Sequence, residues 1–264
     1  MVSEFLSSVL QGLLQGITEF LPVSSSGHLT IFQHLFGGLE SGLTFDLVLH
    51  LSTVLATLLY FRKDILRILA EFFSGFSAPR SERADGWYFG WAVIFGSVPT
   101  AVLGLLFKPL VLKASASTLF VGSALILTGV LLFLTSLIPP GKRKICVSLG
   151  LIIGAAQGIA VFPGISRSGM TQAVGLLCGL SAAEAFRFSF LLSLPAIVGA
   201  AALELRHLEA AAALLPAGWL AGAGTAFLSG LAALCLLHRV VIRGRWRVFA
   251  VYCVCAGFFA IFFL

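Results

Sequence analysis

The stretches QGITEFLPVSSSGHL (residues 15–29) and QGIAVFPGISRSGMT (residues 157–171) repeat each other without a gap and share seven of fifteen residues. The offset between them is 142 residues. Two polar motifs that match in this way predict an internal duplication. We expect a single domain over residues 1–264, with repeats at approximately residues 1–138 and 145–264.

The chain around these motifs is far more apolar than a soluble protein. Of its 264 residues, 59% are hydrophobic and only 11% are charged, whereas soluble domains have about 25% charged residues. A bilayer core about 30 Å thick requires roughly 20 apolar residues for each helix that crosses it. Six apolar runs near that length predict membrane-spanning helices, at approximately residues 43–61, 87–107, 118–138, 183–203, 214–237 and 247–264.

Each repeated motif is too polar in its middle to form a plain span. A break rich in Pro, Gly and Ser separates two apolar segments in residues 3–38 and again in residues 145–181. Irregular backbone within a membrane is tolerated only where protein or a water-filled cavity surrounds it. We therefore expect an all-α integral membrane protein with six transmembrane helices and two re-entrant helical hairpins.

The number of spans in each repeat predicts how the repeats are related. Each repeat would contain one hairpin and three spans, and because three is odd, the second copy must be inverted. Inverted repeats with broken helices usually bring their breaks together near the middle of the membrane. The two motifs are therefore expected to meet there.

The distribution of basic residues predicts the orientation. Twelve of the 17 Lys and Arg residues lie in residues 62–86, 139–144 and 238–247, and such loops face the cytoplasm. Both termini are then expected on the outer, periplasmic side. The net charge of +6 indicates topology, so we expect the lipid bilayer and not nucleic acid as a partner. The oligomeric state is left open, with a homodimer as one alternative.

The second motif has the features of an anion site. Arg167 can clamp a phosphate with two hydrogen bonds, and the backbone N–H groups of residues 166–169 would lie at a helix N-terminus, where anions bind. Gly164 and Gly169 allow close approach of a ligand. Hydroxyl groups accumulate in both motifs, although each alone could be a helix N-cap; they belong to Ser24, Ser25, Ser26, Ser166, Ser168 and Thr171.

The first motif can supply the chemistry. Glu19 and Gln15, four residues apart on one helical face, can hold a divalent cation. Ser25 or His28 can act as nucleophile, and if a helix begins near Ser25, His28 should lie on the same face as a base. Together the two motifs suggest phosphoryl transfer. The alternative is that Glu19 and Arg167 only neutralise each other.

Four polar residues outside the motifs give weaker signals. His34 and His50 lie on apolar segments, and we expect them to be packed rather than functional. Asp46 and Arg187 occupy equivalent positions in the two repeats and have opposite charges, so we expect them to pair beneath the site.

Residues 62–77 have apolar and basic faces typical of an interfacial helix.

The motifs resemble those of a known family. QGITEFLPVSSSGH resembles the (E/Q)xxxE segment, and PGISRSGMT resembles the PGxSRSxxT segment, of undecaprenyl-diphosphate phosphatases, also called bacitracin resistance proteins. The resemblance extends through RFSFLLSLP (residues 187–195) and covers essentially the whole chain. It implies a bacterial inner-membrane enzyme that hydrolyses a polyprenyl diphosphate, undecaprenyl diphosphate, to undecaprenyl phosphate and inorganic phosphate, with Mg²⁺ or Ca²⁺ as cofactor and a periplasmic active site.

The resemblance also implies the site residues. The catalytic residues would be Glu19, Ser25, His28 and Arg167, with Glu19 as the metal ligand. The substrate-binding residues would be Ser24, Ser26, Gly164, Ser166, Ser168, Gly169, Thr171 and Gln15, where Gln15 replaces a carboxylate at the variable E/Q position. A flippase or anion transporter built on the same inverted repeat is the alternative, since transporters share this plan.

Overall fold

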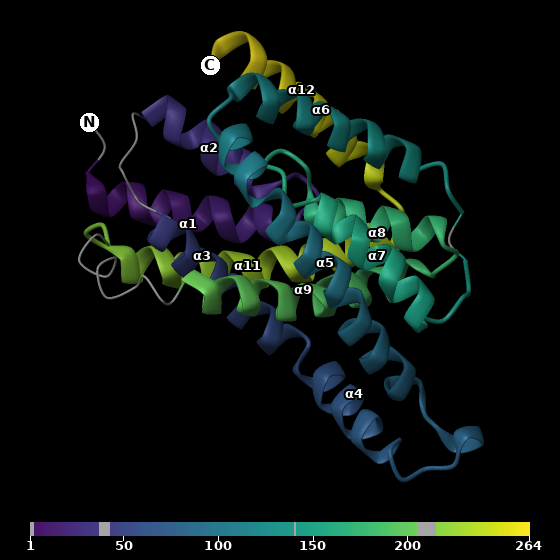
Figure 1. The fold of residues 1–264 in the computed structure, drawn as a ribbon. Helices are drawn as coiled ribbons and strands as arrows, with labels where there is room; N and C mark the ends of the chain where they lie inside the picture. Colours follow the sequence, from purple (N-terminus) through teal and green to yellow (C-terminus); the bar gives the residue numbers. More distant parts are fainter. Residues whose placement is uncertain (1–2, 37–42, 140, 205–214) are drawn as a thin grey trace.

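The computed structural model describes residues 3–36, 43–139, 141–204 and 215–264, and these residues are mainly α-helical (Figure 1). A single isolated β-bridge joins Arg143 to Leu180 within the described residues. The helices are α1 (Glu4–Phe20), α2 (Ser25–Phe36), α3 (Leu43–Tyr60), α4 (Arg62–Ser74), α5 (Asp85–Ser115), α6 (Thr118–Thr135), α7 (Val147–Ile159), α8 (Arg167–Leu177), α9 (Ala182–Glu204), α11 (Trp219–Ile242) and α12 (Trp246–Phe263).

The long helices agree with the predicted spans. Five of the described helices, α5, α6, α9, α11 and α12, are long and apolar enough to cross a membrane. Counting α3 and α4 as one broken span gives up to six, although the pair is bent by 73°. The prediction of an all-α membrane protein is therefore confirmed, and the segment predicted as an interfacial helix forms α4.

Each repeated motif forms two short helices separated by a break, as predicted. α1 and α2 are the arms of the first hairpin, and α7 and α8 are the arms of the second. The second arms begin in the same way: Gly27 N–H donates to Ser24 Oγ (3.3 Å), and Gly169 N–H donates to Ser166 Oγ (3.1 Å). These serines cap α2 and α8 at positions 142 residues apart, because a serine oxygen satisfies an N–H that the helix leaves free.

Equivalent helices of the two repeats run in opposite directions. Gly122 of α6 lies against Gly257 of α12, and Gly129 lies against Ala250. Because residue numbers rise along one helix and fall along the other, α6 and α12 are antiparallel (Figure 1). An inverted repeat requires this arrangement. The repeat boundaries themselves stay a prediction.

Each hairpin packs on a span of the other repeat. In the first, Gly12 of α1 lies against Gly222 of α11; in the second, Gly154 of α7 lies against Gly96 of α5. Small residues allow helix backbones to approach closely, which is the main source of helix association in lipid. The hairpins are therefore held between the repeats, and neither repeat encloses its own hairpin alone.

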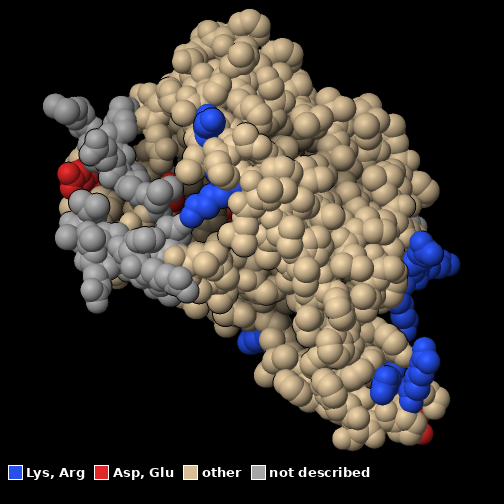
Figure 2. Space-filling model, in the orientation of Figure 1, with Lys and Arg blue, Asp and Glu red and all other residues tan. Residues whose placement is uncertain are grey.

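The buried core surrounds α9. Phe186, Phe188, Phe190 and Leu192 are all at most 1% exposed. Large apolar side chains elsewhere face outward, including Phe262, which is 72% exposed. Figure 2 shows a broad uncharged surface over the middle of the molecule, with Lys and Arg along its right edge down to the end formed by α4 and the start of α5, and others on the left beside the grey atoms. This surface suits contact with lipid.

We predict that Gly154→Val destabilises the protein strongly. A Cβ atom at this position would lie 1.9 Å from the carbonyl oxygen of Gly96, so α5 and α7 would have to separate. Overpacking typically costs 1–3 kcal/mol, and we expect at least about 2 kcal/mol here. Thermal unfolding in detergent measures the effect. Gly224→Val is the control, because nothing lies within 4 Å of its Cβ position, and an equal loss in both variants would contradict the packing argument.

Candidate active site

The tips of the two hairpins meet at a cavity of about 400 Å³. Gly164 N–H of the second tip donates to Ser24 Oγ of the first (3.1 Å), and Ser168 Oγ donates to the carbonyl oxygen of Leu21 (3.3 Å). The predicted meeting of the motifs is thus present in the structure. The polar residues that line the cavity are Thr18, Glu19, Ser24, Ser25, Ser26, His50, Thr100, Gln157, Ser166, Arg167 and Ser193.

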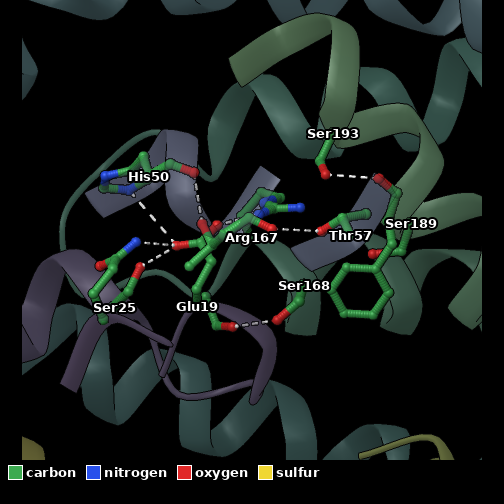
Figure 3. A network of polar contacts seen from close by, with 12 residues as sticks. Glu19, Ser25, His50, Thr57, Arg167, Ser168, Ser189 and Ser193 are labelled. Carbon is green, nitrogen blue, oxygen red and sulfur yellow. Dashed lines mark hydrogen bonds and ion pairs between the residues drawn. The ribbon is translucent and has the colours of Figure 1, made fainter. Parts of the chain in front are cut away.

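Glu19 is the centre of the polar network in this cavity (Figure 3). Its Oε1 atom forms an ion pair with Arg167 Nη2 across the two hairpins. Its Oε2 atom accepts hydrogen bonds from Ser25 Oγ (2.7 Å) and Gln15 Nε2 (3.0 Å) and lies 3.6 Å from His50 Nε2. Four helices, α1, α2, α3 and α8, therefore direct polar side chains at one carboxylate.

The ion pair is buried and incompletely satisfied. The Glu19 side chain is 6% exposed and the Arg167 side chain 18% exposed. Burial of an ion pair costs hydration free energy, and this cost is offset only when further hydrogen bonds satisfy both groups. Arg167 Nη1 and Gln15 Oε1 are nevertheless buried without a hydrogen-bond partner among the described residues. Arg167 therefore offers the cavity a spare guanidinium donor for an anion, whereas Gln15, which donates to Glu19 but is not among the lining residues, has a spare amide oxygen for a cation.

The N-terminus of α8 offers fewer donors than predicted. The N–H of Ser166 donates to Thr128 Oγ1 (3.1 Å), and the N–H of Gly169 donates to Ser166 Oγ. Thr128 Oγ1 also donates to the carbonyl oxygen of Gly164 (2.8 Å), so α6 holds the second tip in place. These two amides are used to shape the break. The anion-binding role predicted for the second hairpin therefore depends mainly on the Arg167 side chain.

Ser24 and Gly164 shape the two tips. Ser24 has φ 70°, and it is the only non-glycine residue with positive φ in the described part of the chain. Gly164 has φ +92°, and a Cβ atom there would lie 2.5 Å from the carbonyl oxygen of Val121. A strained backbone persists only where its surroundings fix it. Here the bond between the two tips does so.

His28 lies away from the cavity, which corrects the prediction that it shares a face with Ser25. Its Nδ1 atom lies 2.8 Å from the carbonyl oxygen of Ser24, and its Nε2 atom lies 2.7 Å from Tyr252 Oη. The ring stacks on Tyr252 of α12. Both ring nitrogens are occupied, because the imidazole joins α2 to α12. Its catalytic role stays a prediction.

Thr171 is also outside the cavity lining. Its Oγ1 atom donates to the carbonyl oxygen of Arg167 (2.8 Å) and lies 2.6 Å from Ser189 Oγ. This arrangement ties α8 to α9. Thr171 therefore contributes to the position of Arg167 and has no contact with the cavity.

His50 is a cavity residue that sequence reasoning missed. It was expected to be packed, yet it lines the cavity beside Glu19, and its Nδ1 atom lies 2.8 Å from the carbonyl oxygen of Asp46. Gln157 was also missed, although it matches Gln15 in the repeated motif. Its Nε2 atom donates to Thr100 Oγ1 (3.3 Å). The internal repeat could have identified Gln157, but no comparable signal marks His50.

The predicted pair of Asp46 and Arg187 is wrong. Arg187 pairs with Glu184 (2.5 Å) and lies 3.6 Å from Asp64, whereas Asp46 interacts with His50 and Gln33. The reason is the inversion: residues near the starts of two antiparallel helices lie at opposite ends of the bundle. Asp46 and Arg187 are therefore far apart because their positions in the two repeats are equivalent.

The residues fit a divalent cation only if the ligand supplies part of its coordination. Among the described residues no group of three or more His, Cys, Asp or Glu side chains could hold a metal. Glu19 is the only carboxylate among the described residues that line the cavity. In the described part of the chain, two glutamines have a side-chain oxygen without a hydrogen-bond partner: Gln15, which donates to Glu19, and Gln157, which lines the cavity. Mg²⁺ is often bound by one or two carboxylates together with substrate phosphates, which matches this donor set.

Together, the fold and the cavity define an all-α membrane protein whose polar site is built between two oppositely directed hairpins. The chain belongs to the family of the bacitracin resistance protein BacA, whose model matches residues 8–259. A protein named undecaprenyl-diphosphatase from Desulfosudis oleivorans is 47% identical, with 96% of each chain covered. Proteins of the same name from Desulforapulum autotrophicum (43% identical, 98% of each chain) and Methanosphaera stadtmanae (37% identical, 98% of this chain and 97% of the relative) are also similar.

We predict that Thr128→Val lowers the stability of the second tip. The variant keeps the shape of the side chain but leaves Gly164 O and Ser166 N–H without their partner, and each buried unsatisfied group costs about 1–3 kcal/mol. Thermal unfolding checks this. The control is Thr135→Val on the same helix, because Thr135 Oγ1 donates only within α6, to Leu131 O. Equal unfolding temperatures for the two variants would show that Thr128 does not hold the tip.

Proposed function

We propose that this protein is a membrane phosphatase that hydrolyses undecaprenyl diphosphate to undecaprenyl phosphate and inorganic phosphate. The family and the names of its relatives support this activity. The observation that carries the proposal is the convergence of Ser25 and Arg167 on Glu19. It combines a nucleophile, a base and an anion-binding group in one cavity.

Substrate binding would begin at Arg167. Its Nη1 atom has no hydrogen-bond partner in the part of the chain that the structure describes, and a guanidinium can bind phosphate oxygens through two parallel hydrogen bonds. A diphosphate carries more negative charge than one carboxylate, so it can compete with Glu19 for this side chain. Binding would then free one oxygen of Glu19 for proton transfer.

Ser25 is the proposed nucleophile. Its hydroxyl already donates to Glu19 Oε2, so Glu19 can accept the proton as Ser25 Oγ attacks the terminal phosphorus. The bond from that phosphorus to the bridging oxygen breaks, and undecaprenyl phosphate leaves. The departing undecaprenyl phosphate takes the proton from Glu19, which becomes a carboxylate again. Glu19 then deprotonates a water molecule that attacks the phosphoserine, the bond from phosphorus to Ser25 Oγ breaks, and Ser25 Oγ recovers the proton from Glu19 as inorganic phosphate leaves. His50, 3.6 Å from the same Glu19 oxygen, can share the transferred proton.

A divalent cation, Mg²⁺ or Ca²⁺, is part of the proposal. Glu19 and Gln15 Oε1 would hold it together with phosphate oxygens, and when bound it would neutralise charge on the diphosphate. Because Gln15 stands in place of a carboxylate, Glu19 provides the only negative protein charge for this cation among the described residues that line the cavity.

We propose the bacterial inner membrane as the location, with both termini and the cavity on the periplasmic side. The basic residues near α4 and in the loops at the same end favour the cytoplasm. The cavity is lined by His50 in the first half of α3 and by Ala200 in the second half of α9, which lie towards the other end. A periplasmic site would recycle the lipid carrier for cell-wall synthesis and so confer bacitracin resistance.

A flippase or anion transporter is the alternative function. The inverted repeat favours it in general, because transporters use this plan. Transport alone does not require a serine hydroxyl bonded to a buried carboxylate, so the bond between Ser25 and Glu19 favours the phosphatase.

We predict that Arg167→Gln and Glu19→Gln each reduce phosphate release from a prenyl diphosphate in detergent by at least about 10²-fold, since removing one preorganised electrostatic group costs 10²–10³. Arg239→Gln is the control, because Arg239 is not among the residues that line the cavity. Turnover in both site variants at the rate of the control would refute the assignment of Glu19 and Arg167.

We also predict that rapid acid quenching traps an acid-stable phosphoryl group on Ser25. Mass spectrometry of the quenched protein would locate it, and Ser25→Ala would lose both the label and turnover. Ser123→Ala is the control, since Ser123 lies exposed on α6 and donates within that helix. An acid-labile label on His28 would instead make the histidine the nucleophile.

A further inference from the structure

A second polar cavity, of about 760 Å³, lies between α4, the start of α5, the residues before α7 and the start of α9. It shares no lining residue with the cavity around Glu19 in the described part of the chain. The phosphatase reaction therefore gives it no role.

The charge of this second cavity is positive. Six basic side chains line it against three acidic ones, Glu71, Asp85 and Glu184. The acids already have partners: Asp85 pairs with Lys144 (2.7 Å), Glu184 pairs with Arg187 (2.5 Å), and Glu71 Oε2 accepts from Gly86 N–H (2.7 Å). Asp85 also raises the pKa of Lys144 by hydrogen bonding and by its charge. The lining residues thus carry an excess of three positive charges, of which Arg67 is paired with Asp64 outside the cavity (2.8 Å).

Arg83 and Lys142 carry part of this excess. Neither forms an ion pair with any carboxylate of the described residues, and Arg83 Nε is buried without a hydrogen-bond partner. The Arg83 guanidinium is held over the Trp87 ring, 4.5 Å from its centroid. A positioned guanidinium with a free donor is suited to a phosphate ligand.

An apolar groove lies next to the polar cavity. It has a volume of about 320 Å³ and lies between α4, α5 and α9. Ile68 and Phe89 line both the groove and the cavity, so the two are adjacent. Trp87 and Trp91 lie beside them, and tryptophan is enriched where a membrane meets water.

We propose that this second cavity binds the headgroup of an anionic bilayer phospholipid, with an acyl chain in the adjoining groove. The phosphate is recognised by Arg83 and Lys142. The ligand is a bilayer lipid because the charged cavity adjoins an apolar groove, with Ile68 and Phe89 lining both. Basic pockets at this level of membrane proteins bind anionic headgroups.

Native mass spectrometry of the full-length protein in detergent, with added phosphatidylglycerol or phosphatidylcholine, tests the proposal. We expect phosphatidylglycerol to bind about tenfold more tightly, and Arg83→Gln combined with Lys142→Gln to remove that preference. The control is Arg243→Gln combined with Arg245→Gln. It removes the same charge from the same end of the molecule, where both arginines are exposed and outside the cavity, and it should keep the preference.

Competition identifies the ligand. Glycerol 3-phosphate and inorganic phosphate should not displace phosphatidylglycerol, because neither fills the groove, and displacement by either would overturn the lipid assignment. If a prenyl monophosphate bound more tightly than phosphatidylglycerol in this competition, the assignment to a bilayer phospholipid would be overturned as well. So would loss of the preference in the control variant. Lipid binding is measured without turnover, so its failure is distinguishable from failure of the proposed phosphatase activity.

Discussion

The structure depends on one ion pair, formed by Glu19 and Arg167 between the two hairpin tips. Either charge alone would be costly within a bilayer, so each hairpin needs the other in order to remain where it is. The pair lies where two broken helices meet, because only there are irregular backbone groups surrounded by protein. Assembly of the hairpins and assembly of the polar site are therefore one event.

Close helix packing supports this arrangement from both sides. Gly12 and Gly154 occupy equivalent positions in the two repeats, and each lets a hairpin approach a span of the other repeat. Thr128 then fixes the second tip from α6. On the first tip, Cys253 of α12 contacts the carbonyl oxygen of Pro22 (3.7 Å). The same kind of contact thus occurs twice, with different side chains.

The sequence predicted the features that repeat or that depend on composition. The hairpins, the spans and the meeting of Glu19 with Arg167 follow from motif and hydropathy. The surroundings of His28 and His50 did not, because a histidine on an apolar helix has no pattern that tells which neighbour it faces. The prediction for Asp46 and Arg187 failed for a related reason, since it applied equivalence by sequence where the inversion reverses position.

Ser25 and Arg167 occupy the same position in the two repeats, the first residue of α2 and of α8. A symmetric pair of identical half-length chains could place two serines or two arginines there, but never one of each. Glu19 likewise corresponds to Val161 in the other copy. Fusion of the two copies into one polypeptide is thus what permits a hydroxyl on one side and a guanidinium on the other, and one asymmetric site in place of two identical halves.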